Sequence, residues 1–189
     1  MSALEAGTGD FSEAADQLDQ AVDGLRRAGY QEATARGLLA RAEFHRVSGE
    51  FPHARRGLDE AHEIATRGGM RLFECDCHLE SCRLILAMVQ AGEKLNPEDL
   101  FPDSPLALYD AVNQPLAAAQ KHLNKAETMV NEMGYHRRDP ELLLETAHIQ
   151  ILEGKKDAAR QTLAQAKKKI DEMGAHRWEI DLRELNKRL

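Results

Sequence analysis

Apolar residues recur along the chain at steps of three and four, the spacing that places them on one face of an α-helix. In residues 32–48, Ala35, Leu38 and Ala42 follow this pattern, and residues 139–153 repeat it. No segment shows the sustained alternation of apolar and polar residues that is typical of a half-buried strand. The pattern therefore predicts an all-α protein.

A motif of a small residue, a leucine, a second small residue and a terminal glycine occurs four times. The equivalent residues are Ala14, Ala54, Ala119 and Ala159, then Leu18, Leu58, Leu123 and Leu163, then Ala21, Ala61, Ala126 and Ala166, and finally Gly29, Gly69, Gly134 and Gly174. Each glycine follows a predicted helix and can adopt the left-handed conformation that ends it. The spacing of about forty residues predicts a solenoid of antiparallel helix pairs, since one pair cannot bury its apolar face alone.

The repeat divides the chain into one domain of about three and a half units. These are a half unit at 3–29, a unit at 30–69, an interrupted unit at 70–134 with an insertion at 92–114, a unit at 135–174 and a capping helix at 176–189. The half unit suggests that the chain is cut from a longer protein or that another subunit covers its first helix. At the other end, Trp178 is expected to pack on the last helix pair, with a binding anchor as the alternative.

The spacing of small residues between one predicted helix and the next resembles that of a known family. Ala54, Leu58 and Ala61 follow Ala42 at 12, 16 and 19 residues, and the same offsets from Ala147 reach a second such set. This arrangement resembles the tetratricopeptide repeat family, and the long period is similar to the repeat tails of bacterial signalling NTPases and transcription regulators. The resemblance implies a right-handed α-solenoid without enzymatic activity, whose first helices line a concave groove that binds a partner protein.

The resemblance also implies which side chains face that groove. They are Arg36, Glu43, Arg46, Asp76, Leu79, Arg83, Leu86, Glu141, Leu144, His148 and Ile151. Their mixture of charges and exposed leucines suits a helical or extended peptide. We therefore expect a protein-interaction scaffold. The alternative is a regulatory or sensor tail of a larger NTPase or transcription regulator, which binds an effector or self-associates.

Two further segments are candidate interaction surfaces. In the insertion at 92–114, Leu100, Phe101 and Tyr109 stand out among acidic residues and prolines. This segment could dock on the solenoid, bind a partner or be disordered, since long loops inside compact domains fall into these classes. In the first helix, Phe11, Leu18, Val22 and Leu25 form an apolar stripe that is expected to mediate self-association.

Composition narrows the classes of partner. The chain has 25 Lys and Arg against 32 Asp and Glu, a formal net charge of −7, so nucleic acid is not an expected partner. No window approaches the roughly 18 apolar residues that cross a bilayer, and the opening residues lack the layout of a secretion signal. A cytoplasmic protein without membrane attachment is expected.

Candidate chemistry is sparse. Cys75, His78 and Cys82 lie at helical spacing, but the repeat aligns them with apolar positions, so packing is favoured over metal binding or redox sensing. His136 to Arg138 and His176 to Arg177 follow terminal glycines, and they are expected to cap carbonyl groups or form surface pairs, with anion binding as the alternative. No phosphate loop, zinc-protease or serine-hydrolase motif occurs. The sequence predicts no enzyme, cofactor or metal.

Overall fold

The computed structural model describes residues 11–92 and 114–189, and all regular secondary structure in these two ranges is helical. The α-helices are α1 (Phe11–Ala28), α2 (Gln31–Val47), α3 (Phe51–Arg67), α4 (Arg71–Ala91), α6 (Pro115–Met133), α7 (Asp139–Leu152), α8 (Lys156–Met173) and α9 (Glu179–Lys187). Two short 3-10 helices, η2 (His136–Arg138) and η3 (His176–Trp178), precede α7 and α9. The predicted all-α class is confirmed for these residues.

The helices begin and end where local sequence favours it. Prolines stand in the first turns of α3, α6 and α7, where a missing backbone N–H breaks no helical hydrogen bond. Gly134 and Gly174 follow α6 and α8 with φ of 63° and 60°, the left-handed region in which a side chain would be strained. These two glycines end their helices as the repeat predicts.

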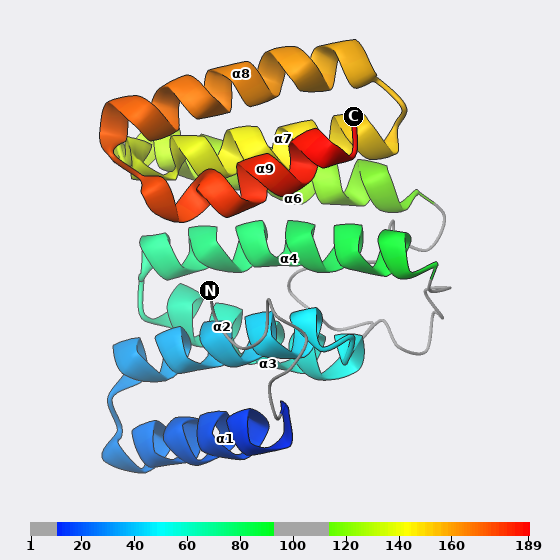
Figure 1. Cartoon of the computed structure of the whole chain (residues 1–189). Helices are drawn as coiled ribbons and strands as arrows, with labels where there is room; N and C mark the ends of the chain where they lie inside the picture. The colour runs from blue at the N-terminus through cyan, green and yellow to red at the C-terminus, as the bar shows by residue number, and fades with distance from the viewer. Residues whose placement is uncertain (1–10, 93–113) are drawn as a thin grey trace.

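Successive helices pack on one another in the order of the chain, and Figure 1 shows the resulting stack from α1 to α8 with α9 beside α7. Contacts also join α2 to α4, α4 to α7 and α7 to α9, so these helices lie side by side. The interrupted unit retains its central contact, because α4 packs on α6 although residues 93–113 separate them. None of the described helices is long and apolar enough to cross a membrane.

Small residues fill the contact between α2 and α3. Ala42, Ala54 and Ala61 are fully buried, and a Cβ atom at Gly57 would lie 3.4 Å from the Cβ of Ala42. The alanines and the glycine therefore allow the two backbones to approach closely. This explains in physical terms why the repeat keeps small residues at these positions.

The three cysteines are free and fully buried. Cys75 and Cys82 belong to the cluster between α4 and α6, and the Cys75 thiol faces the carbonyl oxygen of Ala126 at 3.7 Å. Burial raises the pKa of Cys75 to about 12, so the thiol stays protonated. The packing role predicted for these residues is confirmed by their burial.

The apolar stripe of the first helix is only partly available. Val22 is fully buried and clusters with Leu38, Ala61 and Cys77, whereas Leu18 and Leu25 are half-buried. The expectation that Val22 offers an uncovered surface is therefore wrong, because α1 packs on α2. The side chain of Phe11 lies outside the described part of the structure.

Candidate functional site

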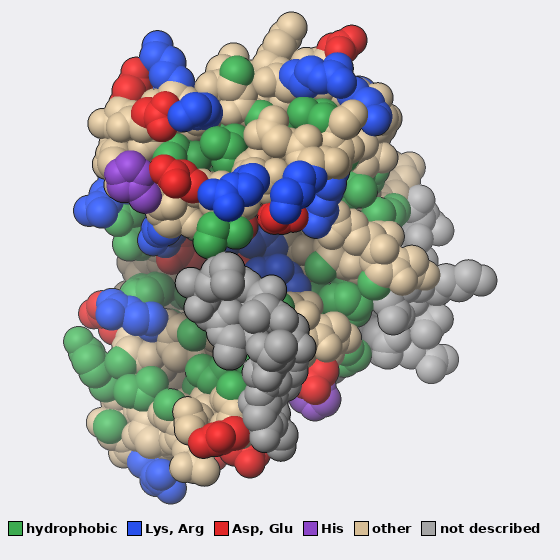
Figure 2. Space-filling view, viewed as in Figure 1, with side chains coloured by type: hydrophobic (Ala, Val, Ile, Leu, Met, Phe, Trp, Pro, Cys, Tyr) green, Lys and Arg blue, Asp and Glu red, His purple; other side chains and the backbone are tan. Residues whose placement is uncertain are grey.

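A groove of about 830 Å³ runs across α2, α4, α7 and α9. Figure 2 shows acidic and basic side chains recessed between the part of this face formed by α9 and the part that contains α2. Among the described residues, the lining contains arginines but no lysine, and aspartates and glutamates lie among the arginines. The charged residues are Arg36, Arg46, Arg83, Arg138, Arg177 and Arg188, with Glu43, Asp76, Glu80, Glu141, Glu145, Asp181 and Glu184.

The structure brings together most of the residues that the sequence placed in a groove. Nine of the eleven line it, namely Arg36, Glu43, Arg46, Asp76, Leu79, Arg83, Glu141, Leu144 and His148. Leu86 and Ile151 do not. A binding role for these residues stays a prediction.

The expectation of exposed leucines on this face is wrong. Leu79, Leu86 and Leu144 have exposed fractions of only 1%, 0% and 3%. Leu79 and Leu86 pack in the cluster between α4 and α6, and Leu144 packs in the cluster of α7, α8 and α9. The same helices supply both the groove and the core, so their leucines are taken up by packing. The surface that remains is mixed, with charged side chains beside half-buried Phe73 and Trp178.

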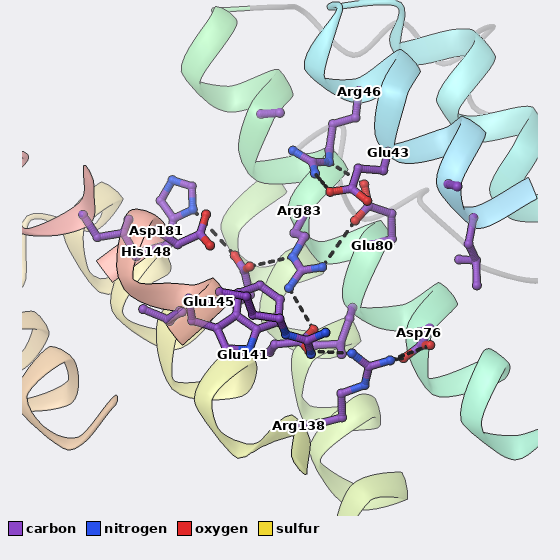
Figure 3. A pocket seen from close by; sticks show the side chains of 18 of the residues that line it. Glu43, Arg46, Asp76, Glu80, Arg83, Arg138, Glu141, Glu145, His148 and Asp181 are labelled. Atoms are coloured by element: carbon purple, nitrogen blue, oxygen red, sulfur yellow. Dashed lines mark hydrogen bonds and ion pairs between the residues drawn. The ribbon is translucent and has the colours of Figure 1, made fainter. Parts of the chain in front are cut away.

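Arg83 lies at the centre of the groove and joins α4 to α7 (Figure 3). Its Nε donates to Glu145 Oε1 at 2.7 Å, and one Nη donates to Glu141 Oε2 at 3.1 Å. Its other Nη lies 3.5 Å from Glu80 Oε2. The planar guanidinium carries five N–H donors, which allows one side chain to face three carboxylates.

Further arginines extend this ion network to neighbouring elements. On one side, Arg46 of α2 pairs with Glu80 of α4. On the other side, Arg138 of η2 pairs with Asp76 at 2.6 Å and also with Glu141, and Arg177 of η3 reaches Glu141 at 3.0 Å. The network therefore connects α2, α4 and α7 with both 3-10 segments.

The carboxylates of the network differ in their electrostatic surroundings. Burial alone would raise the pKa of Glu145, but Arg83 and His148 outweigh it and lower that pKa to about 2. At Glu80, burial outweighs Arg46 and Arg83 and raises the pKa. Burial likewise raises the pKa of Asp76 to about 6 despite the adjacent Arg138. Glu145 is thus a permanent anion, while Asp76 changes its charge under mildly acidic conditions.

Several residues of the groove were not identified from the sequence. No motif or spacing in the sequence marks Glu80 or Glu145 as a groove residue. Glu145 does lie one helical turn after Glu141, so the two share a face of the helix. Arg138 and Arg177 were expected to cap carbonyls or form surface pairs. Arg138 instead turns into the groove, whereas Arg177 forms an ion pair from an exposed position at the rim. Both bind the carboxylate of Glu141, which has an exposed fraction of 1%. Their shared position after a terminal glycine was the signal that could have placed them together.

Trp178 combines a packing role with a place in the groove. It packs on the cluster of α7, α8 and α9, which confirms the expected contact with the last helix pair. Its ring also lies 4.5 Å from the guanidinium carbon of Arg177 and 5.7 Å from that of Arg83. The indole N–H is buried and has no hydrogen-bond partner among the described residues.

The exposed rim of the groove carries charges that remain open to solvent. The side chains of Arg36, Glu43 and Arg177 have exposed fractions of 72%, 63% and 64%. Each of the three also has an ion-pair partner: Glu32 for Arg36, Arg46 for Glu43 and Glu141 for Arg177. The groove therefore has an exposed charged rim above a more buried ion network.

Leu100, Phe101 and Tyr109, the residues of the second predicted patch, lie outside the described residues. Comparison of the chain with known protein families, with curated proteins and with solved structures gives no match.

Proposed function

We propose that this protein is a non-enzymatic α-solenoid of antiparallel helix pairs, similar to tetratricopeptide repeats, that binds a peptide or helical segment of a partner protein. The observation that carries the proposal is the charged groove along α2, α4, α7 and α9. The repeat spacing and the small residues between α2 and α3 support the solenoid arrangement. The three free thiols suit a reducing compartment such as the cytoplasm.

The shape and charge of the groove favour a peptide as the ligand. The groove crosses four helices, which gives an elongated segment several successive contacts. The groove carries both arginines and carboxylates. It therefore matches a segment with charges of both signs better than a polyanion. Half-buried Phe73, beside Arg36, and Trp178, beside Arg177, offer aromatic surface for an anchor residue.

Selection from a displayed library of random peptides tests the proposal, because it does not require the natural partner. Peptides that carry acidic and basic residues around an apolar anchor should be enriched. Their dissociation constants, measured by fluorescence anisotropy, should be in the micromolar range of a transient interaction, about −8 kcal/mol. Binding should weaken as salt rises, because rim charges are screened.

Charge reversals at the rim locate the site. Arg36→Glu combined with Glu43→Lys changes two exposed residues that line the groove. It removes the 3.9 Å contact of Glu43 with Arg46 but replaces no residue of the pairs that Arg83 forms with Glu80, Glu141 and Glu145. A loss of affinity of about tenfold, or 1.4 kcal/mol, is expected. Arg67→Glu is the matched control, since this side chain is 70% exposed on α3 and does not line the groove. The proposal fails if no peptide is enriched, or if the control weakens binding as much as the rim reversals.

A further inference from the structure

A cluster of histidines lies outside the groove, where α3, α4 and α6 meet. His62 comes from α3, Glu74 and His78 from α4, and His122 from α6. Glu74 and His78 are one helical turn apart, so they share a face of α4. One donor atom each of His62, Glu74 and His78 lie within 4.8 Å of one another. None of these four residues lines the groove.

His122 fixes the orientation of His78. Their Nδ1 atoms are 3.1 Å apart, so one nitrogen carries a hydrogen and donates it to the other. If His78 is the donor, its Nε2 retains a lone pair for a metal ion. Metal-binding histidines usually donate their second N–H to a neighbouring acceptor in this way.

Two polar groups of the cluster have unused binding capacity. The Nδ1 atom of His62 is buried and has no hydrogen-bond partner within the ranges that the structure describes. The carboxylate of half-buried Glu74 forms no ion pair with any described residue. A buried polar atom without a partner is costly, and a cation bound through Nδ1 of His62 would satisfy that atom.

We propose that His62, Glu74 and His78 bind one divalent transition-metal ion of the zinc class, with His122 as the residue that orients His78. Two imidazoles and one carboxylate suit zinc or cobalt rather than calcium or magnesium, which prefer oxygen ligands alone. Ligands of a tetrahedral zinc ion lie about 3.3 Å apart, given bonds of about 2.0–2.1 Å. The three donor atoms, which lie within 4.8 Å of one another, therefore have to move closer together when an ion binds. Three protein ligands leave a fourth position open to water.

The site revises the expectation of no metal without involving the cysteines. The zinc ligands that sequence spacing alone suggests would come from one helix and could not surround an ion. The tertiary structure instead brings His62 of α3 to within 4.8 Å of the donor atoms of Glu74 and His78 on α4. Cys77, which adjoins His78, has a pKa raised by burial and remains a thiol. A bound ion would join α3 to α4 directly.

Titration of the whole, metal-free protein with Co²⁺ tests the proposal, because tetrahedral cobalt has intense visible absorption. One equivalent of Co²⁺ should bind, Zn²⁺ should displace it, and either ion should raise the thermal unfolding temperature. Glu74→Gln and His62→Gln should abolish the tetrahedral spectrum. His122→Gln should keep the spectrum but weaken affinity roughly 10–100-fold, as expected for an orienting residue.

His176→Gln is the matched control, since His176 and Glu179 form an exposed pair at 2.7 Å that lacks a third ligand among the described residues. This variant should bind cobalt as the wild type does. His62 is buried, so circular dichroism is used to check that His62→Gln folds. If His62→Gln does not fold, the result for Glu74→Gln decides the outcome, because Glu74 is only half-buried. Absence of a one-to-one cobalt complex, or equal affinity of Glu74→Gln and the wild type, would overturn the proposal.

Discussion

Replacing Arg83 with methionine should destabilise the protein by about 3–5 kcal/mol, the usual cost of removing one partner from a buried ion pair. The three carboxylates around Arg83 have side-chain exposures of only 6%, 2% and 12% for Glu80, Glu141 and Glu145. Glu141 would keep two arginine partners and Glu80 would keep Arg46. Among the described residues Glu145 would keep only His148, at 3.7 Å, and it should account for most of the loss.

The pKa of Glu145 reflects burial, which opposes its charged form, and the stronger stabilisation of that charge by Arg83 and His148. Its displacement from 4.5 to about 2 corresponds to about 3 kcal/mol in favour of the folded protein. Because the folded-state pKa is depressed, this stability is present above the ordinary pKa and is lost as the pH falls toward the folded value. The difference in the free energy of unfolding between the wild type and Arg83→Met should therefore decrease by about 2 kcal/mol when the pH falls from 5 to 3.

Urea unfolding followed by circular dichroism at both pH values measures these differences. Glu145→Gln in the Arg83→Met background should recover part of the lost stability, because it removes the unpaired charge. Arg160→Met is the control at an exposed arginine and should change stability by less than about 0.5 kcal/mol. An Arg83→Met protein within about 1 kcal/mol of the wild type at pH 7, or a difference that does not depend on pH, would refute the buried network.

Three further predictions concern packing and association. Gly57→Val should destabilise the protein by about 1–3 kcal/mol in urea unfolding, because its Cβ would contact Ala42. Gly24→Val is the control and should not destabilise the protein, since no atom of the described residues lies within 4 Å of its added Cβ. Equal effects of the two substitutions would argue against close contact of α2 and α3. Sedimentation should show concentration-dependent self-association of the wild type that Leu18→Glu abolishes, and a strictly monomeric wild type would exclude association through α1. The buried thiols of Cys75, Cys77 and Cys82 should react with a thiol reagent far more slowly in the native protein than in urea, and equally fast reaction would contradict their burial.

The sequence predicts the helices well because their signals are local. Apolar spacing marks the helices themselves, and residues such as Gly134 mark where they end. The resemblance to tetratricopeptide repeats places Arg36 and His148 on a groove, and both line the groove of the structure. The helices themselves depend only on helical periodicity, whereas the groove lining also depends on the geometry that the resemblance implies.

The remainder of the site depends on long-range contacts. Glu145 matters because Arg83 faces it from 62 residues away, and neither residue carries a local signal of that pairing. Leu79 was placed on the groove correctly, but its burial depends on how α6 packs beside α4. The histidine cluster likewise forms only when α3 brings His62 to α4. Such properties are set by tertiary packing.

Trp178 provides the most direct test of peptide binding in the groove. It is the only tryptophan in the sequence and lines the groove, so its indole N–H gives one assignable signal in a nitrogen–proton NMR spectrum. Titration with a peptide from the library selection should shift this signal saturably, with the dissociation constant that anisotropy gives. The Arg36→Glu and Glu43→Lys reversals should move the midpoint to about tenfold higher peptide concentration. A peptide that binds with that affinity and leaves the Trp178 signal unmoved would contradict the assignment of the groove as the binding site.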